Sequence, residues 1–414
     1  MRILLANKFY YRRGGDCIYT LNLESMLKEN GHDVAIFAMQ CADNLPSEWS
    51  KYWPSEATFR PGPKMIKGFL RPFGSKEVAK KFAALVDDFK PDVVHVGNIH
   101  SQLSPIIVKI AHEKGLMVVW SIHDYKLLCP RYDFLQNGKT VCEECLRNVH
   151  AVLDHNCVKN SKVASFLGYK EAMKWTRKDL DEWTDSFVCA SDFVSNIMVR
   201  GGFSKEKVHT IMHSIDTDGC MLDSYQPKDE RDYYCFIGRL SHEKGSKTLI
   251  EAANRLSHKL VVIGDGPLSE ELKAIAHENI EFVGFQNWDG IKRIVSKARF
   301  CVAPSEWYEV LGLVNLEALC LGVPLLGANI GSIPYLINQS NGLTFEPRNV
   351  EDLSNKIGLM WKADFDYKAI AKVAIEAYSN KAYYEKLMKI YNKIGFVSPE
   401  RRYEAPTVAR PPQM

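Results

Sequence analysis

Residues 299–328 read "RFCVAPSEWYEVLGLVNLEALCLGVPLLGA", and this stretch decides the class of fold. Two short apolar runs, 299–304 and 323–328, stand on either side of a segment with helical character, 313–321. A strand, a helix and a second strand in this order form a right-handed crossover, which predicts parallel strands. Because both runs are mostly apolar, we expect a sheet that is buried on both faces.

The same alternation runs along the whole chain. Apolar runs typical of strands lie at 2–7, 33–39, 91–96, 116–122, 185–190, 207–212, 232–238, 259–264 and 280–284. Segments of helical period lie near them, among them 15–32, 101–114, 161–182, 191–201 and those that begin at Ser246 and Pro267. A chain of 414 residues is too long for one ordinary core. The prediction is an α/β protein with two doubly wound, Rossmann-like domains that face a central cleft.

Polar and turn residues interrupt this alternation near 212–232, which places the domain boundary there. We assign 1–213 to the first domain, with a cysteine-containing insertion at 127–160, and 214–377 to the second. A last helix at 378–398 is expected to pack back on the first domain. The tail 399–414 has no periodicity and is expected to be flexible.

Composition excludes several classes of protein. The net charge of +3 is too small to indicate nucleic-acid binding by itself. No uncharged apolar run is long enough to span a membrane, and the apolar stretch at the N-terminus is too short for a signal peptide. The eleven cysteines are an odd number, and several lie in apolar runs. These features favour a reducing cytoplasm.

Ligands of open α/β sheets bind at the carboxyl ends of the strands. After the first strand, Gly14 and Gly15 open a helix, whose free N–H groups suit a phosphate; the alternative is an ordinary turn. His123 and Asp124 follow the run 116–122, where a histidine suits a hydroxyl or a proton transfer; the alternative is a structural turn.

Two cations follow the strand at 232–238, within "GRLSHEKG". Arg239 and Lys244, with Gly238 beside them, suit a diphosphate; the alternative is a pair of solvated side chains. The next strand ends in "GDGPL", which lacks the GxGxxG pattern of a nicotinamide dinucleotide site.

The quoted stretch itself carries two glutamates. Glu309 lies in a loop at a strand end, whereas Glu317 lies in a helix whose other residues are mostly apolar. A surface stripe would prefer a spacing of three or four residues, and a buried carboxylate needs partners, often a ligand. Gly312, at the start of the helix, leaves N–H groups free for a phosphate.

Taken together, these motifs resemble the retaining glycosyltransferases of family 4, which have the GT-B fold. The resemblance covers about residues 1–395. It rests on "EVLGLVNLE", which matches the E-x7-E element, and on "GG", "HD", "HSID", "GRLSHEKG", "GDGPL" and "EALCLGVPLL", in the order and at the spacing of that family.

The resemblance implies roles for single residues. It makes 214–377 the nucleotide-sugar domain and 1–213 the acceptor side. Glu309 would contact the donor sugar, Glu317 the ribose, and Arg239 and Lys244 the diphosphate. His123 would face the transferred hexose. The remaining implied contacts are to the donor, from Gly14, Gly15, Gly238, Leu311, Gly312 and Leu313, and to the acceptor, from Asn98 and Asp124. No metal in the active site and no cofactor are implied.

Two positions depart from the family pattern. Leu311 stands where phenylalanine is common, which is a mild change. Tyr335, in "GSIPY", replaces an acid, which puts a local contact in doubt but not donor binding.

Two further features suggest partners. Cys129, Cys142, Cys145 and Cys157 form a C-x12-C-x2-C-x11-C set that predicts a structural zinc, with His150 and His155 as alternative ligands; reduced thiols are the other interpretation. Basic and aromatic residues mix in 51–82, which suits an anionic membrane surface, although a solvated face fits equally well.

The sequence therefore predicts a cytoplasmic enzyme, peripheral on the inner face of the cell membrane. It would move a hexose from a nucleotide diphosphate sugar to a glycan acceptor, polyprenyl-linked, in the synthesis of a bacterial surface polysaccharide. The alternatives are an epimerase or phosphorylase of the same architecture and a non-catalytic scaffold.

Overall fold

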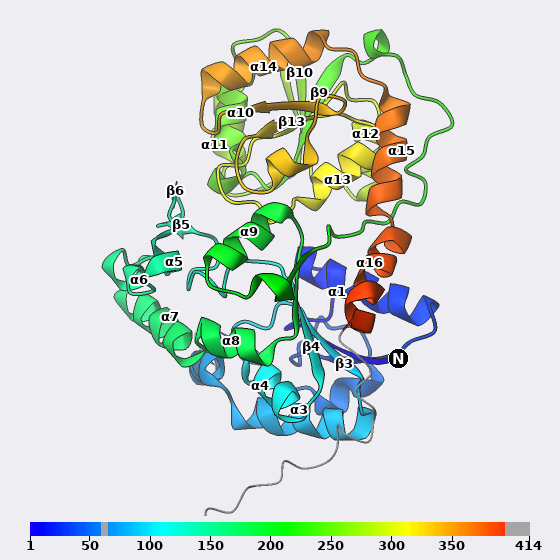
Figure 1. Ribbon diagram of the computed structural model, residues 1–414. Helices are drawn as coiled ribbons and strands as arrows, with labels where there is room; N and C mark the ends of the chain where they lie inside the picture. Colours follow the sequence, from blue (N-terminus) through cyan, green and yellow to red (C-terminus); the bar gives the residue numbers. More distant parts are fainter. Residues whose placement is uncertain (59–64, 394–414) are drawn as a thin grey trace, which may run out of the picture. The chain divides into compact units, whose positions relative to one another are not determined.

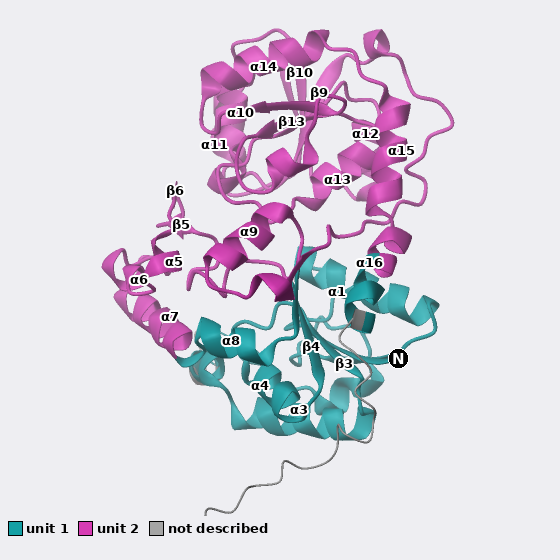
Figure 2. Ribbon diagram, in the orientation of Figure 1, with its two compact units in different colours: residues 1–121, 174–188, 386–414 teal, residues 122–173, 189–385 magenta. Residues whose placement is uncertain are grey.

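The computed structural model describes residues 1–58 and 65–393 (Figure 1). The predicted flexible tail, 399–414, lies outside the described residues, as does part of the basic segment 51–82. The chain forms two compact units (Figure 2). Unit 1 comprises 1–121, 174–188 and 386–414, and unit 2 comprises 122–173 and 189–385. These compact units do not test the domain boundary at residue 213, which stays a prediction.

The first sheet has six strands in the order β2-β1-β3-β4-β7-β8. The pairs β1–β2, β1–β3 and β3–β4 are parallel. The strands are β1 (Arg2–Ala6), β2 (Asp33–Phe37), β3 (Val93–Val96), β4 (Met117–Ile122), β7 (Ser186–Cys189) and β8 (Val208–Thr210).

Its associated helices are α1 (Gly15–Glu29), α2 (Met65–Leu70), α3 (Lys76–Phe89), α4 (Ile106–Glu113), α8 (Arg177–Trp183) and α9 (Asp192–Arg200). Ser191 caps α9, because its hydroxyl accepts the N–H of Val194. Between β4 and β7 lie a small antiparallel hairpin, β5 (Leu135–Gln136) and β6 (Thr140–Val141), and the helices α5 (Glu144–Arg147), α6 (Ala151–Asp154) and α7 (Lys162–Lys174).

The second sheet has the order β11-β10-β9-β12-β13-β14 with every pair parallel. Its strands are β9 (Tyr233–Ile237), β10 (Lys259–Ile263), β11 (Ile280–Gly284), β12 (Cys301–Ala303), β13 (Leu325–Ala328) and β14 (Gly342–Phe345). The helices after them are α10 (Ser246–Ala253), α11 (Ser269–Ile275), α12 (Trp288–Val295), α13 (Leu313–Cys320), α14 (Val350–Lys362), α15 (Tyr367–Tyr378) and α16 (Asn380–Lys393).

Alternate residues of the second sheet enter two separate cores. Cys235 and Ile237 of β9 join a core with α13 and α15, whereas Tyr234 and Phe236 join a core with α10, α11 and α14. This is the period of two that a strand buried on both faces requires. The predicted pair of doubly wound, Rossmann-like sheets is confirmed.

The end of α16 packs in unit 1. Its Tyr391 is buried, and the hydroxyl lies 2.6 Å from Nδ1 of His95 in β3. Burial keeps the pKa of His95 low, at about 3, so this histidine is neutral at physiological pH. No helix in the described ranges combines the length and the apolarity that crossing a bilayer would require.

Gly245 offers a test of how tightly the second sheet's loops pack. Its φ is +66°, and a Cβ added there would lie 1.8 Å from the carbonyl oxygen of Pro304. We therefore expect Gly245→Ala to destabilise the chain by more than about 2 kcal/mol, since both backbone strain and a backbone clash oppose it.

Thermal unfolding of the purified variant measures the effect. Gly358→Ala is the matched control, because a Cβ added at Gly358 would have nothing within 4 Å and the residue stands inside α14. A Gly245→Ala protein as stable as the Gly358→Ala protein would contradict the close approach.

Candidate active site

The loops after β9 and β12 meet in unit 2, because these two strands are neighbours in the second sheet. Lys244 ends a short 3-10 helix, His242–Lys244, that follows β9. Glu309 lies in the loop between β12 and α13, as the sequence predicted. Ligands of open α/β sheets bind where the strand order reverses, and β9 and β12 flank this point.

The carboxylate of Glu309 is buried and fully satisfied. Nζ of Lys244 donates to both of its oxygens at 2.9 Å. The indole N–H of Trp307 donates to Oε2 at 2.7 Å, and the hydroxyl of Ser305 donates to the same oxygen at 3.2 Å. A buried carboxylate is stable only with such partners. Lys244 also lies over the ring of Trp307, with Nζ 5.5 Å from the ring centroid.

Backbone contacts hold the Glu309 loop in place. Its carbonyl oxygen accepts the N–H of Ser332 at 3.1 Å. Gly331, with a φ of +60°, allows this approach, because a Cβ there would lie 2.7 Å from the nitrogen of Glu309. The hydroxyl of Ser332 donates to the carbonyl of Val310 at 2.7 Å. The loop is therefore fixed on both sides of the glutamate.

Helix α13 begins directly after this loop. Gly312, with a φ of +78°, stands at its N-terminus, and the buried Leu311 precedes it. The first N–H groups of a helix, here beginning with Leu313, have no partner within the helix and suit an anion. The helix therefore begins where the sequence predicted it to begin.

Glu317 lies in α13 and is half-buried. Burial raises the pKa of its carboxyl group to about 7. Among the described residues, no side chain donates a hydrogen bond to this carboxylate or pairs with it. It differs in this from Glu309, and it has capacity for hydrogen bonds from a ligand.

Arg239 is exposed, two residues after the end of β9. The preceding Gly238 packs against the "GDGPL" turn, since a Cβ on Gly264 would lie 2.0 Å from the carbonyl oxygen of Gly238. Lys244 and Glu309 are therefore the two predicted phosphate and sugar residues that the fold brings into direct contact, whereas the Arg239 side chain extends into solvent.

The "HD" motif lies at the end of β4, and its residues belong to unit 2. The rings of His123 and His213 lie 5.2 Å apart. Burial and the neighbouring His123 keep the pKa of His213 well below its usual value. Asp124 accepts the backbone N–H of Lys126 at 2.9 Å, which is a turn contact. Tyr125 is buried, and both burial and the charge of Glu309 raise the pKa of its hydroxyl.

The other predicted residues belong to unit 1. Gly14 and Gly15 stand at the N-terminus of α1, and Gly14 is extended rather than left-handed, with a φ of −155°. The backbone N–H of Asn98 donates to Oδ1 of Asn7 at 2.8 Å.

Sequence reasoning missed Trp307, Ser305 and Tyr308 as parts of the site. All of them lie in the loop that carries Glu309, and the phenol of Tyr308 donates to Oε1 of Glu143 at 2.9 Å. Their position in "SEWYE", next to a predicted site residue, was the available signal.

Two family models match the chain. The model described as Glycosyltransferase Family 4 matches residues 13–218, and the model described as Glycosyl transferases group 1 matches residues 222–378. Together they cover most of the sequence and include every predicted site residue.

Similar proteins are also known. An uncharacterized 42.6 kDa protein in the cps region of Klebsiella pneumoniae is 26% identical over 355 residues, which are 81% of this chain and 87% of the relative. The O-antigen chain mannosyltransferase C of Escherichia coli is 26% identical over 188 residues, 41% of this chain and 51% of that protein. The crystal structure of Anabaena HepE in complex with UDP superposes with a TM-score of 0.66 at 16% identity, over 95% of this chain and 100% of HepE.

The protonation of Glu317 makes the stability of the native state depend on pH. Below about pH 4.5 its carboxyl group is protonated in both the folded and the unfolded chain. Its burial therefore does not lower the free energy of unfolding at such pH. Above about pH 7 it is charged in both states, and its burial then opposes folding. The native state should lose up to about 3 kcal/mol as the pH rises between these values.

Urea unfolding of wild type and Glu317→Gln at about pH 5 and pH 8 measures this effect. We expect the variant to gain stability relative to wild type at the higher pH. Glu270→Gln is the control, because Glu270 has 89% of its side chain exposed and pairs with Lys273 at the surface. If the free energies of unfolding of Glu317→Gln and wild type differed by the same amount at both pH values, burial would not raise the pKa of Glu317.

Proposed function

The chain belongs to the family 4 glycosyltransferases with the GT-B fold, and we propose that it moves a hexose from a nucleotide diphosphate sugar to a glycan acceptor with retention of configuration. The observation that carries this proposal is the pair Lys244–Glu309 at the point where the strand order of the second sheet reverses. A cation and a carboxylate at one such point suit a substrate that has a diphosphate and a sugar.

The diphosphate gains negative charge as it leaves the sugar. Lys244, Arg239 and the N–H groups at the start of α13, from Leu313 on, would stabilise that charge and so lower the barrier. Gly238 and Leu311 would line the same region. With these groups in place the leaving diphosphate would not need a metal ion, and we propose that transfer is metal-independent.

Donor binding would change the partners of Lys244. In the described structure Lys244 neutralises Glu309. Phosphate oxygens would compete for the ammonium group, and the freed Glu309 oxygens would accept hydrogen bonds from sugar hydroxyls. Trp307 and Ser305 would keep the carboxylate oriented during this exchange. Glu317, whose carboxylate has hydrogen-bonding capacity to spare, would accept from the ribose hydroxyls.

The acceptor side is proposed on the resemblance alone. His123 would face the transferred hexose, and Asp124 and Asn98 would contact the acceptor, whereas Gly14 and Gly15 would contact the donor. These residues belong to two compact units, so their joint arrangement belongs to the proposal.

The relatives support a role in surface polysaccharide synthesis. One is encoded in a cps region, and another is an O-antigen mannosyltransferase. We propose a polyprenyl-linked acceptor and a cytoplasmic enzyme on the inner face of the membrane. Within 51–82, Phe69 and Leu70 are 38% and 64% exposed and suit membrane contact. Arg71 is instead buried and forms an ion pair with Glu77, so it would not contact the membrane.

Lys244→Ala and Glu309→Ala should each reduce sugar transfer by about a hundredfold or more, since the first removes a cation beside the leaving diphosphate and the second removes the acceptor that would orient the sugar. Transfer is measured with the purified full chain in buffer freed of unbound divalent cations by a chelating resin. We expect wild type to be active there without added Mg²⁺ or Mn²⁺.

Lys247→Ala is the matched control, because Lys247 lies in the adjacent α10 and pairs with the exposed Glu271. Thermal unfolding shows whether each variant is folded. Wild-type rates in folded Lys244→Ala and Glu309→Ala proteins would show that the site is assigned wrongly, and an absolute need for Mg²⁺ would exclude the metal-free mechanism.

A screen of nucleotide sugars by thermal shift separates the alternatives. Donor binding stabilises the native state by mass action, by about 2.7 kcal/mol at a ligand concentration one hundred times Kd. We expect a shift with at least one nucleotide diphosphate sugar and with its nucleoside diphosphate. A scaffold would show no shift with any of them. An epimerase would show a shift and would alter the sugar nucleotide without a glycan acceptor. A phosphorylase would instead need inorganic phosphate and a glycan, from which it would release sugar phosphate.

A further inference from the structure

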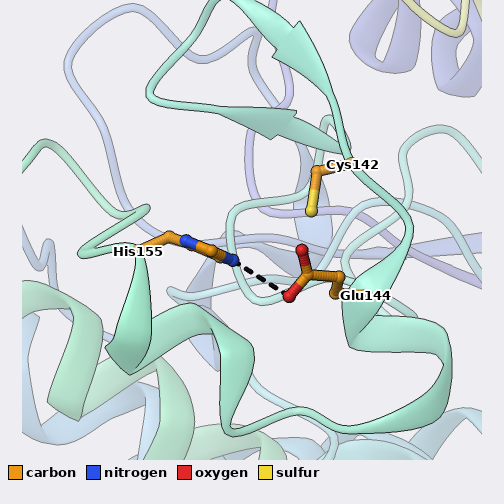
Figure 3. A group of neighbouring side chains, drawn as sticks. All are labelled: Cys142, Glu144 and His155. Atoms are coloured by element: carbon orange, nitrogen blue, oxygen red, sulfur yellow. Dashed lines mark hydrogen bonds and ion pairs between the residues drawn. The ribbon is translucent and has the colours of Figure 1, made fainter.

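Three side chains of types that bind metals meet in the insertion between β4 and β7 (Figure 3). Cys142 directly follows β6, Glu144 begins α5, and His155 directly follows α6. The sulfur of Cys142, a carboxylate oxygen of Glu144 and a ring nitrogen of His155 all lie within 4.8 Å of one another. Figure 3 shows these side chains pointing toward a common space. A thiolate, a carboxylate and an imidazole are all ligands of zinc.

A tight hairpin brings Cys142 to this place. Asn137 and Gly138, in the turn between β5 and β6, have φ values of +54° and +74°. Two residues with positive φ make the turn that an Asn-Gly pair favours. The N–H of Cys142 donates to the carbonyl oxygen of Phe134 at 2.7 Å, which continues the pairing of the two strands beyond β6. The backbone therefore fixes Cys142 directly before α5, where Glu144 lies.

Both ring nitrogens of His155 have partners that orient the ring. Nε2 lies 2.9 Å from a carboxylate oxygen of Glu144, and Nδ1 lies 2.9 Å from the side-chain amide of Gln136 in β5. Since a carboxylate only accepts hydrogen bonds, Nε2 donates to it. A histidine that binds a metal is held in the same way, by a hydrogen bond to its other ring nitrogen. Gln136 thus holds the ring with Nε2 toward Glu144.

We propose that Cys142, Glu144 and His155 bind one Zn²⁺, with a water molecule as the fourth ligand. Ligand atoms of a tetrahedral zinc ion lie roughly 3.3–3.6 Å apart, so small side-chain movements would close the group around the ion. The side chains of Glu144 and His155 are 61% and 25% exposed, so water reaches the fourth position.

Protons and charge balance when the ion binds. The thiol of Cys142 loses its proton to the solvent, because the thiolate is the ligand. The ring of His155 changes its tautomer, so that Nε2 binds the ion and Nδ1 donates to the carbonyl oxygen of the Gln136 amide. One thiolate and one carboxylate then neutralise the two charges of Zn²⁺.

The ion would also position the loop that carries Glu309, an effect that rests on the proposed function. Glu143 stands between the ligands Cys142 and Glu144 in the chain. Its carboxylate accepts a hydrogen bond from the hydroxyl of Tyr308 at 2.9 Å, and Tyr308 directly precedes Glu309. Fixing both neighbours of Glu143 therefore fixes Glu143, and through it Tyr308.

Helix α9 packs against both members of this link. Arg200 pairs with the Glu143 carboxylate, and the ring centroid of Phe193 lies 4.8 Å from that of Tyr308. The link between the ion and the Glu309 loop thus consists of packed side chains that all belong to unit 2.

The zinc content of the tag-free full chain tests the site. Wild type that is equilibrated with Zn²⁺ and then separated from unbound metal should hold one zinc per chain. Glu144→Gln and His155→Ala should hold less than a tenth of that. His150→Ala is the matched control and should retain all of it, because His150 lies in the same insertion but pairs with Asp154. Thermal unfolding shows whether each variant is folded.

Co²⁺ in place of Zn²⁺ reports the number of sulfur ligands. The charge-transfer absorption from sulfur to cobalt should have the intensity of one thiolate. An intensity of four thiolates would overturn the assignment. It would place the ion on the set predicted from the sequence, Cys129, Cys142, Cys145 and Cys157, which stays a prediction.

Two further results would overturn the site. Full zinc content in folded Glu144→Gln and His155→Ala proteins would place the ion elsewhere. Wild type that retains neither Zn²⁺ nor Co²⁺ would show that Glu144 and His155 form an ion pair alone.

The positioning role has its own readout. Tyr308→Phe should retain the full zinc content and lose about tenfold in kcat/KM for the donor, and removal of zinc from wild type should cause a similar loss. Removal of zinc from Tyr308→Phe should then cause no further loss, since the ion acts through the Tyr308 hydroxyl. An equal loss on zinc removal in both proteins would refute this link.

The two parts of the inference fail separately from the proposed function. Zinc content and the cobalt absorption are measured without any transfer assay. A chain that transfers no sugar would therefore leave the metal result intact, whereas an active chain without zinc would remove the site and keep the proposed function.

Discussion

The pairing of β12 with β9 is the constraint on which the site depends. Cys301 lies beside Cys235 and Val302 beside Phe236, in parallel register. In the chain, β10 and β11 come between β9 and β12, and they lie on the other side of β9 in the sheet. Because the order reverses here, the loops that leave the two strands emerge side by side. Lys244 and Glu309 come from these loops and meet although 65 positions separate them in the sequence.

Close packing of those loops then determines the chemistry. Gly245 lies against the carbonyl of Pro304, and Gly331 lies against the nitrogen of Glu309, so neither position has room for a side chain. Glu309 becomes buried as a result, and a buried carboxylate must be matched by donors. Lys244, Trp307 and Ser305 supply them.

The two glutamates of residues 299–328, Glu309 and Glu317, therefore differ in their surroundings. Glu309 has a cation and two neutral donors, whereas burial raises the pKa of Glu317 to about 7. A loop provides the first, and the helix α13 provides the second. One short segment thus offers a paired carboxylate, a helix N-terminus and a carboxylate with hydrogen-bonding capacity, in that order along the chain.

Sequence alone determined the elements of this protein and the element on which each site residue lies. The strands at 233–237 and 301–303, the helix from Leu313 and the loop position of Glu309 all follow from apolar runs and glycines, which are local signals. Tertiary structure decided which of these residues meet. The ammonium of Lys244 on Glu309, the rings of His123 and His213, and the phenol of Tyr308 on Glu143 depend on strand order and on the paths of long loops. A single sequence carries no direct record of such distant contacts, because each is fixed by the packing of the whole sheet rather than by its neighbours in the chain.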